Sequence, residues 1–150
     1  IDQPGENDRG TVDPGRVRGE LRFEAVSFSY GSEGRAALAG IDLAIAPGET
    51  VALVGASGSG KTTLANLVPR FYVPTAGRIL LDGRDTGDLT LAGLRANIAL
   101  VSQDVVLFND TVVANIAYGA MKQASREEIV AAAEAAHAME FIAQMPQGLD

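Results

Sequence analysis

The sequence predicts an α/β fold in which an antiparallel β layer precedes a parallel core. Over residues 20–46, apolar residues alternate with polar ones, a pattern typical of half-buried strands. An apolar run at 50–55 then leads through a glycine-rich loop into a helical pattern, which indicates a strand buried on both faces, as in a parallel sheet. Helical spacing over 125–145 predicts a helical segment near the end of the chain.

Composition excludes several classes of function. The chain has 150 residues, with 12 Lys plus Arg against 19 Asp plus Glu and a formal net charge of −7, which argues against a nucleic-acid or anionic-membrane surface. It contains no cysteine, so disulfides and thiolate metal sites are excluded. No apolar run approaches the about 20 residues that a membrane span needs. The start, IDQPGENDRG, is no signal peptide and lacks a methionine, so we expect a part of a longer protein.

The first 48 residues are predicted to form an arm and two strands. Residues 1–19 are rich in glycine, proline and charge without an apolar period, which predicts a linker. Residues 20–30 alternate as a strand, with a one-residue slip near Ala25 that indicates a bulge. A turn at 31–37 separates it from a second half-buried strand at 41–46, which ends at a Pro-Gly turn.

Six further elements are predicted downstream, and their order completes the α/β pattern. Each is supported by its apolar spacing and by the residues that end it. They are a buried strand at 50–55, a helix at 62–68 ended by Pro69, a strand at 77–85 with an Asp82-Gly83 turn, a short helix at 90–95 and a buried strand at 97–103; the helix at 125–145 then begins with a Ser125/Glu128 capping box and ends at Pro146.

Residues 55–62, GASGSGKT, match the pattern G-x-x-x-x-G-K-[ST] at every fixed position, between a predicted strand and a predicted helix. Gly58 and Gly60 allow backbone angles closed to other residues, so that N–H groups can turn inward around a phosphate. The helix start adds favourable potential for an anion. Lys61 supplies a mobile charge for the β- and γ-phosphates, and the Thr62 hydroxyl is placed to bind Mg²⁺. A phosphate-binding P-loop is therefore predicted.

Two other interpretations of the loop are weaker. A merely flexible glycine loop would match four constrained positions by chance only about once in 10⁴ to 10⁵ starting residues, given average glycine usage. A dinucleotide-binding loop would need G-x-G-x-x-G after a strand, and no predicted strand is followed by it.

From residue 20 to residue 150 the chain resembles the N-terminal portion of the ATP-binding domain of ABC exporters, and most of all bacterial lipid A export proteins of the flippase type. Tyr30 matches the A-loop aromatic residue that stacks on adenine, although a tyrosine at a strand end can equally be packing. Gln103 matches the Q-loop glutamine that reaches toward Mg²⁺ and the attacking water, although alone it would be an ordinary loop residue. The resemblance implies Lys61 and Gln103 as catalytic residues, Thr62 and Gln103 as metal ligands, and as ATP-binding residues Tyr30, Gly55, Ser57, Gly58, Ser59, Gly60, Lys61, Thr62 and Thr63.

Two later segments also resemble the family. Residues 105–119 are similar to the exporter segment that docks the membrane domains, with Phe108 at its centre; the alternative is that Leu107, Phe108, Val112 and Ile116 are ordinary core. Residues 125–150 resemble the start of the helical subdomain, whose alanines favour close packing over chemistry. The resemblance makes residues 1–19 a linker from a preceding membrane domain.

Several of the family's catalytic motifs are not found before Asp150. They are the LSGGQ signature, the Walker B aspartate with its catalytic glutamate, the D-loop and the switch histidine. His137 is not preceded by the strand that the switch histidine needs, so it is expected to be a packed or half-exposed helix residue. Asp82 heads a turn and Asp104 follows Gln103, so neither replaces the missing acids. We therefore expect the truncated domain to lack a general base and the later strands of its core, leaving an apolar sheet edge.

For the intact protein, the resemblance implies an Mg²⁺-dependent ATPase that powers export of a lipid or another amphipathic substrate. Its partners would be the transmembrane domains of the same transporter and a second ATP-binding domain, with a homodimer expected, at the cytoplasmic face of the bacterial inner membrane. This chain alone is expected to bind ATP without turnover. Two alternatives are a non-catalytic nucleotide-binding or coupling fragment and another P-loop kinase or NTPase. A GTPase would show N-K-x-D and D-x-x-G motifs downstream of the P-loop, and neither is found there.

Overall fold

The computed structural model describes residue 6 and residues 8–31, 36–102 and 106–150. The chain divides into two compact units, Ile1–Leu100 and Val101–Asp150. Each unit is considered by itself. Among the described helices, none combines the length and the apolar character that crossing a bilayer would require.

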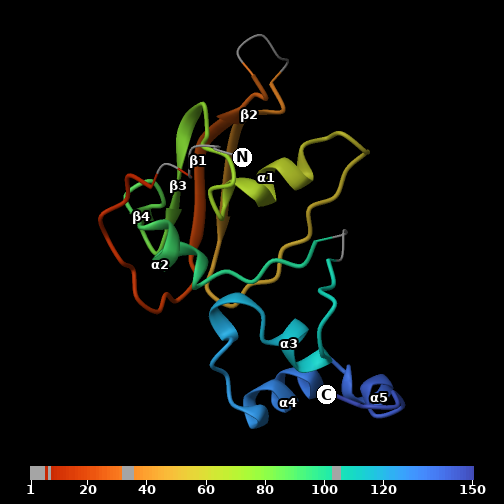
Figure 1. The fold of residues 1–150 in the computed structure, drawn as a ribbon. Helices are drawn as coiled ribbons and strands as arrows, with labels where there is room; N and C mark the ends of the chain where they lie inside the picture. Colours follow the sequence, from red (N-terminus) through yellow and green to blue (C-terminus); the bar gives the residue numbers. More distant parts are fainter. Residues whose placement is uncertain (1–5, 7, 32–35, 103–105) are drawn as a thin grey trace. The chain divides into compact units, whose positions relative to one another are not determined.

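Unit 1 contains a four-stranded antiparallel sheet in the order β2-β1-β3-β4 (Figure 1). The predicted N-terminal β layer is therefore confirmed, and so is the bulge. The registers of β1 with both neighbours shift around Ala25, which has a left-handed φ of 47° and donates its N–H to Asp42 Oδ1 at 2.8 Å. The strands are β1 (Leu21–Phe28), β2 (Leu38–Ile45), β3 (Ala76–Leu81) and β4 (Arg84–Asp85).

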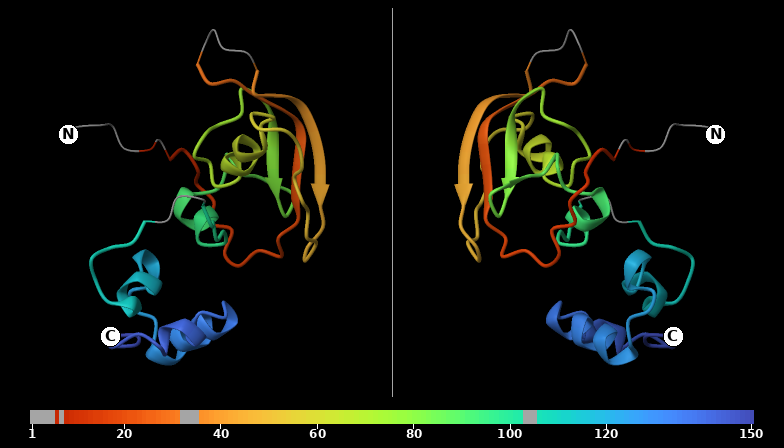
Figure 2. Two further views of the ribbon diagram at one scale, coloured as in Figure 1. Left: turned by 90° about the vertical axis from the view of Figure 1, so that its right-hand side faces the viewer. Right: turned by 90° about the vertical axis from the view of Figure 1, so that its left-hand side faces the viewer.

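Helix α1 (Lys61–Leu67) covers one face of this sheet, as both views in Figure 2 show. Its apolar residues Leu64 and Leu67 are buried against side chains from β1, β2 and β3, so the strand alternation and the helical period face the same core. The position of α1 matters because the predicted P-loop immediately precedes it. The buried cluster consists of Phe23, Val26, Phe28, Leu38, Leu64, Leu67 and Ile79.

Helix α2 (Leu91–Arg95) belongs to a second buried cluster of unit 1, formed by Leu81, Leu89 and Leu94. Its Thr90 cap accepts the Gly93 N–H, as expected for a threonine before a helix. Val12 and Val17 from the N-terminal arm pack against this cluster, and Val12 forms a β-bridge with Leu89. The described part of residues 1–19 therefore lies against the rest of unit 1, while its role as a linker from a membrane domain stays a prediction.

Two arginines contact Glu6 and Asp8 of the arm. Arg95 donates to the Glu6 carboxylate at 2.8 Å and to the Pro69 carbonyl at 2.9 Å. Arg70 lies 3.8 Å from the Asp8 carboxylate. The arm is thus tied to the segment that follows α1.

The predicted parallel strands at 50–55 and 97–103 are wrong for the described residues. Residues 51–55 and 98–102 have no strand assignment, and Val54 and Val101 are 89% and 96% exposed. A strand needs a neighbour to complete its hydrogen-bond ladder, and neither segment pairs with another strand in the part of the chain described here. Apolar composition alone was therefore insufficient to form the predicted parallel core.

Unit 2 is helical, with α3 (Val112–Ile116), a 3₁₀ turn η1 (Gly119–Met121), α4 (Arg126–Ala135) and α5 (Met139–Ile142). The predicted capping box is confirmed: Ser125 Oγ accepts the Glu128 N–H at 3.2 Å, and Glu128 Oε2 accepts the Ser125 N–H at 2.8 Å. Its buried core contains Ala133, Ile142 and Leu149.

The single helix predicted at 125–145 is wrong, because the chain leaves the helical path after Ala135. His137 has a left-handed φ of 54°, and the N–H of Ala138 reaches back to the Ala133 carbonyl at 2.8 Å. This closure ends α4 before α5 begins. His137 is consequently an exposed turn residue rather than a packed helix residue.

Candidate functional site

The glycine loop at 55–60 precedes α1 and has the backbone that the motif requires. Gly58 has φ 78° and Gly60 has φ 92°, both in the left-handed region that favours glycine. A Cβ at Gly60 would lie 2.7 Å from the Ala37 carbonyl oxygen and 2.8 Å from Leu38 Cδ2. Glycine is therefore needed at position 60 for two reasons, the backbone angle and the close approach of the β2 entry.

Lys61 folds its side chain back over the loop. Its ammonium donates to the carbonyl oxygens of Gly55 and Ala56, both at 2.9 Å, and lies 3.4 Å from Ser59 Oγ. These contacts hold the positive charge beside the backbone of the loop. The loop and the cation that a triphosphate would need are thus in one place.

The N-terminus of α1 adds unpaired donors to this loop. The first N–H groups of an α-helix have no partner within the helix, and no side chain caps α1 at Gly60. Thr62 is exposed in the first turn, while Thr63 is only 7% exposed and faces the interior. An exposed hydroxyl beside uncapped N–H groups suits a phosphate-bound Mg²⁺, which usually takes few ligands from the protein. No group of three His, Cys, Asp or Glu side chains suitable for a metal occurs among the described residues.

Tyr30 is brought to the start of α1. Its hydroxyl and that of Thr63 are hydrogen-bonded, with 2.9 Å between the oxygens. Its ring packs edge to face against Phe28 and Tyr72, with centroid separations of 4.8 and 5.2 Å. Tyr30 nevertheless remains 50% exposed, so part of its surface is free for a ligand.

The predicted site is only partly assembled by the described residues. Tyr30 and the P-loop residues lie together in unit 1, whereas Gln103 lies outside the described residues. Tyr72, which packs against Tyr30, was not predicted as a site residue. The aromatic pair Phe71-Tyr72 soon after the helix-ending Pro69 is the only signal that could have indicated it.

The segment 106–119 in unit 2 contains both exposed and packed apolar residues. The rings of Phe108 and Tyr118 are stacked, with centroids 4.2 Å apart, and both side chains are exposed, as is Leu107. Val112 and Ile116 pack against the core of unit 2. Val112 and Ile116 thus fit the interpretation as ordinary core, whereas Leu107 and Phe108 are exposed. The docking role of Phe108 stays a prediction.

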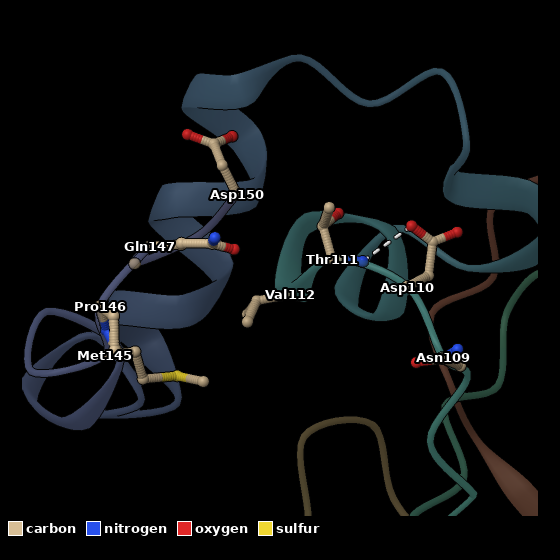
Figure 3. Close-up of a pocket in the computed structure, with 9 residues that line it drawn as sticks. Asn109, Asp110, Thr111, Val112, Met145, Pro146, Gln147 and Asp150 are labelled. Atoms are coloured by element: carbon tan, nitrogen blue, oxygen red, sulfur yellow. Dashed lines mark hydrogen bonds between the residues drawn. The ribbon is translucent and has the colours of Figure 1, made fainter.

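Figure 3 shows a cavity of unit 2 that no sequence motif predicted. It has a volume of about 580 Å³. Asp110 Oδ1 accepts the Thr111 N–H at 2.7 Å, and Asp150 accepts from Arg126 at 2.8 and 2.9 Å, so both carboxylates that line the cavity already have partners. The lining residues are Asn109, Asp110, Thr111, Val112, Met145, Pro146, Gln147, Gly148 and Asp150.

Comparison with known proteins identifies the family. The sequence profile of the family described as "ABC transporter" matches residues 38–148. Two ATP-dependent lipid A-core flippases, from Chromobacterium violaceum and Thiobacillus denitrificans, are 65% and 63% identical over 150 residues. Each alignment covers 100% of this chain and 26% of the flippase, so the chain spans about a quarter of the length of these relatives.

A solved structure is also similar. It is described as a bacterial Atm1-family ABC exporter with ATP bound, has 46% sequence identity and a TM-score of 0.83, and is matched over 100% of this chain and 25% of that one. The fold is accordingly that of a P-loop ABC ATPase, with the antiparallel layer and helices described above. The profile match covers most of the sequence and includes the glycine loop at 55–62: the chain belongs to the ABC transporter family.

Proposed function

We propose that this chain binds the triphosphate of ATP through the loop at 55–62 and the first turn of α1. One observation carries the proposal: the loop has left-handed glycines at 58 and 60, and the Lys61 ammonium lies directly on it. Membership of the ABC transporter family and likeness to an exporter with ATP bound support ATP as the nucleotide.

The residues would divide the task as follows. The N–H groups of Ser57, Gly58 and Gly60 would surround the phosphates, and that of Ser59 would join them by giving up its bond to the Ala56 carbonyl at 3.2 Å. Lys61 would exchange its contacts with Gly55 and Ala56 for the β- and γ-phosphate oxygens. Because the ammonium is hydrogen-bonded both before and after ATP binding, this exchange adds little to the free-energy cost of binding.

Mg²⁺ and the adenine base would be held beside this phosphate-binding loop. The hydroxyl of Thr62 and the side-chain oxygen of Gln103 are the proposed Mg²⁺ ligands, and Gln103 would also orient the attacking water. When bound, Mg²⁺ neutralises charge on the β- and γ-phosphates. The exposed face of Tyr30 would stack on adenine, and Thr63 would hold the Tyr30 hydroxyl.

For the intact protein, we propose ATP hydrolysis that drives export of a lipid or another amphipathic substrate. The flippase relatives support lipid as the cargo. The transmembrane domains and a second ATP-binding domain would be its partners, at the cytoplasmic face of the bacterial inner membrane. Within this chain we propose binding without turnover, because no Walker B acid or catalytic glutamate was found in its sequence.

Calorimetric titration with Mg-ATP tests the binding proposal. The expected result is saturable binding by the wild type and its loss in Lys61→Ala. Lys122→Ala is a matched control, because Lys122 is the only other lysine in the sequence and is exposed. Circular dichroism of all three proteins establishes that they are equally folded.

Two outcomes would contradict the proposal. If the folded wild type does not bind Mg-ATP, the loop of this chain does not function as a P-loop. If Lys61→Ala and Lys122→Ala lose equal affinity, the loss reflects the net charge of the chain and not a specific contact of Lys61. Phosphate release measured on the same proteins tests the proposal that this chain binds ATP without hydrolysing it. Turnover by the wild type that disappears in Lys61→Ala would overturn binding without hydrolysis.

A further inference from the structure

We propose that Tyr72 is a positioning residue that orients the Tyr30 ring for the nucleobase. The inference rests on the proposed function, because it assumes that Tyr30 contacts adenine. Tyr72 lies outside the P-loop motif, and it acts here through Tyr30 rather than on the phosphates. Its predicted effect is therefore specific to the base of the nucleotide.

Three rings form the contact. The Tyr30 and Tyr72 centroids are 5.2 Å apart with an interplanar angle of 86°, and those of Phe28 and Tyr30 are 4.8 Å apart at 87°. Phe28 and Tyr72 close the triangle at 5.3 Å. Edge-to-face pairs at such distances are attractive and depend on orientation. Tyr30 is thus held between two rings while it remains 50% exposed.

The hydroxyl of Tyr30 supplies the remaining constraint. It bonds to Thr63 Oγ1 at 2.9 Å, in the first turn of α1. Tyr72 follows the other end of the same helix. Both the ring and the hydroxyl of Tyr30 therefore contact residues in or soon after the helix that begins at Lys61. These contacts fix the distance between the Tyr30 ring, on which the base would stack, and the phosphate-binding loop. Such prior orientation reduces the entropy lost when a ligand binds.

The segment that carries Tyr72 is itself anchored. The Phe71 N–H reaches back to the Asn66 carbonyl at 3.2 Å, and the Arg95 guanidinium lies 5.2 Å from the centre of the Phe71 ring. Phe71 thus faces Arg95, whereas Tyr72 faces Tyr30. Neighbouring aromatic residues on one segment have separate partners, which provides a matched control.

The test compares Mg-ATP with inorganic tripolyphosphate plus Mg²⁺ as calorimetric probes of the 150-residue chain. Tyr72→Leu should weaken ATP binding about three- to tenfold, the loss expected from one aromatic edge contact, and leave tripolyphosphate binding unchanged. Tyr72→Phe retains the ring and should behave as wild type. Phe71→Leu makes a similar change one residue away and should leave the ratio of the two affinities unchanged.

A double-mutant cycle separates positioning from general stability. In a Tyr30→Leu background, Tyr72→Leu should no longer alter ATP affinity, because the group through which it acts is gone. If Tyr72→Leu fails to fold, Tyr30→Phe removes the hydroxyl that bonds to Thr63, keeps the ring and the phosphate-binding residues, and should give a selective loss for ATP.

Three results would overturn the proposal. Equal weakening of ATP and tripolyphosphate would assign Tyr72 a structural role, and an unchanged ratio in both Tyr72→Leu and Tyr30→Phe would remove the positioning role. A wild type that binds tripolyphosphate in a Lys61-dependent way but gains nothing from the adenosine moiety leaves the P-loop proposal standing and contradicts the base platform. Absence of any binding by the wild type overturns both.

Discussion

Helices α1 and α4 end with the same backbone geometry, but only one of these ends is locked by its side chain. After α1, Arg70 has φ 57°, and the N–H groups of Arg70 and Phe71 bond to carbonyls three and five residues earlier at 3.1 and 3.2 Å. After α4, His137 has φ 54°, and the N–H groups of His137 and Ala138 make the equivalent bonds at 2.9 and 2.8 Å. Both ends thus place a non-glycine residue in the left-handed region, usually glycine's position.

The two side chains differ in what they contact. The Arg70 side chain is 9% exposed and donates to the Thr86 and Leu89 carbonyls at 3.1 and 2.7 Å. His137 is exposed, and its turn depends on backbone bonds. Local turn geometry is therefore the same in both units, while the tertiary contribution is present in unit 1 only. Replacing each residue by glycine separates these contributions.

Arg70→Gly should destabilise unit 1 by about 2–3 kcal/mol, because two buried carbonyls lose a charged donor and the arginine stem loses its packing. Relief of the left-handed angle offsets only part of this loss. Amide hydrogen exchange of residues in β1 and β3 measures the effect within unit 1, without interference from unit 2. Unchanged protection there would show that the guanidinium contacts add nothing to the turn.

Features encoded by neighbouring residues were predicted from the sequence. The Asp82-Gly83 turn and the Ser125/Glu128 capping box depend on residues within a few positions, and the slip in alternation that indicates the Ala25 bulge is visible within a few positions too. All three features are present. The P-loop was predictable for the same reason, since its fixed positions are consecutive or nearly so.

Features that depend on distant partners could not be predicted in this way. The apolar runs at 51–55 and 98–102 resemble buried strands in composition, but whether they pair depends on segments elsewhere. The contact of Tyr72 with Tyr30 joins residues far apart in the sequence, and so does that of Arg70 with Leu89. His137 has no feature that identifies it as a left-handed turn residue, so the break between α4 and α5 was missed.

Asp82 and Asp150 extend the comparison to the acids of the two units. In Asp82 the N–H groups of Arg18, Gly19 and Glu20 hold the pKa of the carboxyl below its usual range, with that of Arg18 the largest cause. In Asp150 the pKa is lowered by the Arg126 guanidinium, in a pair whose side chains are both exposed. We therefore expect the carboxylate that accepts three backbone N–H bonds to contribute more to the free energy of unfolding than the ion pair that solvent screens.

Asp82→Asn should therefore destabilise unit 1 by about 1–2 kcal/mol, since asparagine tolerates the left-handed angle but loses the charge and one acceptor oxygen. Asp150→Asn is the control, and its smaller effect on unit 2 should fade further as salt rises. Urea unfolding followed by hydrogen exchange in each unit measures both. Equal effects in the two variants would contradict the distinction between the acids.

The pH dependence gives the Asp82 prediction a sign. A carboxyl with a depressed folded-state pKa contributes stability above its unfolded-state pKa and loses it as the pH falls through the folded-state value. The difference between wild type and Asp82→Asn should accordingly be full at neutral pH and shrink below about pH 4. A difference that stays constant from neutral to acid pH would mean that the three N–H bonds do not depend on the charge.

His137→Gly should have the smallest effect and the opposite sign to Arg70→Gly. Glycine has no Cβ to oppose a left-handed angle, and this gain exceeds its greater freedom in the unfolded chain, so unit 2 should be stabilised by about 0.5–1 kcal/mol. Protection of the Ala138 N–H, which bonds to Ala133, reports the change directly. Because the histidine side chain is exposed, its removal costs no packing, whereas the same substitution at Arg70 removes a buried guanidinium. Destabilisation by His137→Gly would therefore mean that the imidazole, like the Arg70 side chain, holds its helix end from outside the turn.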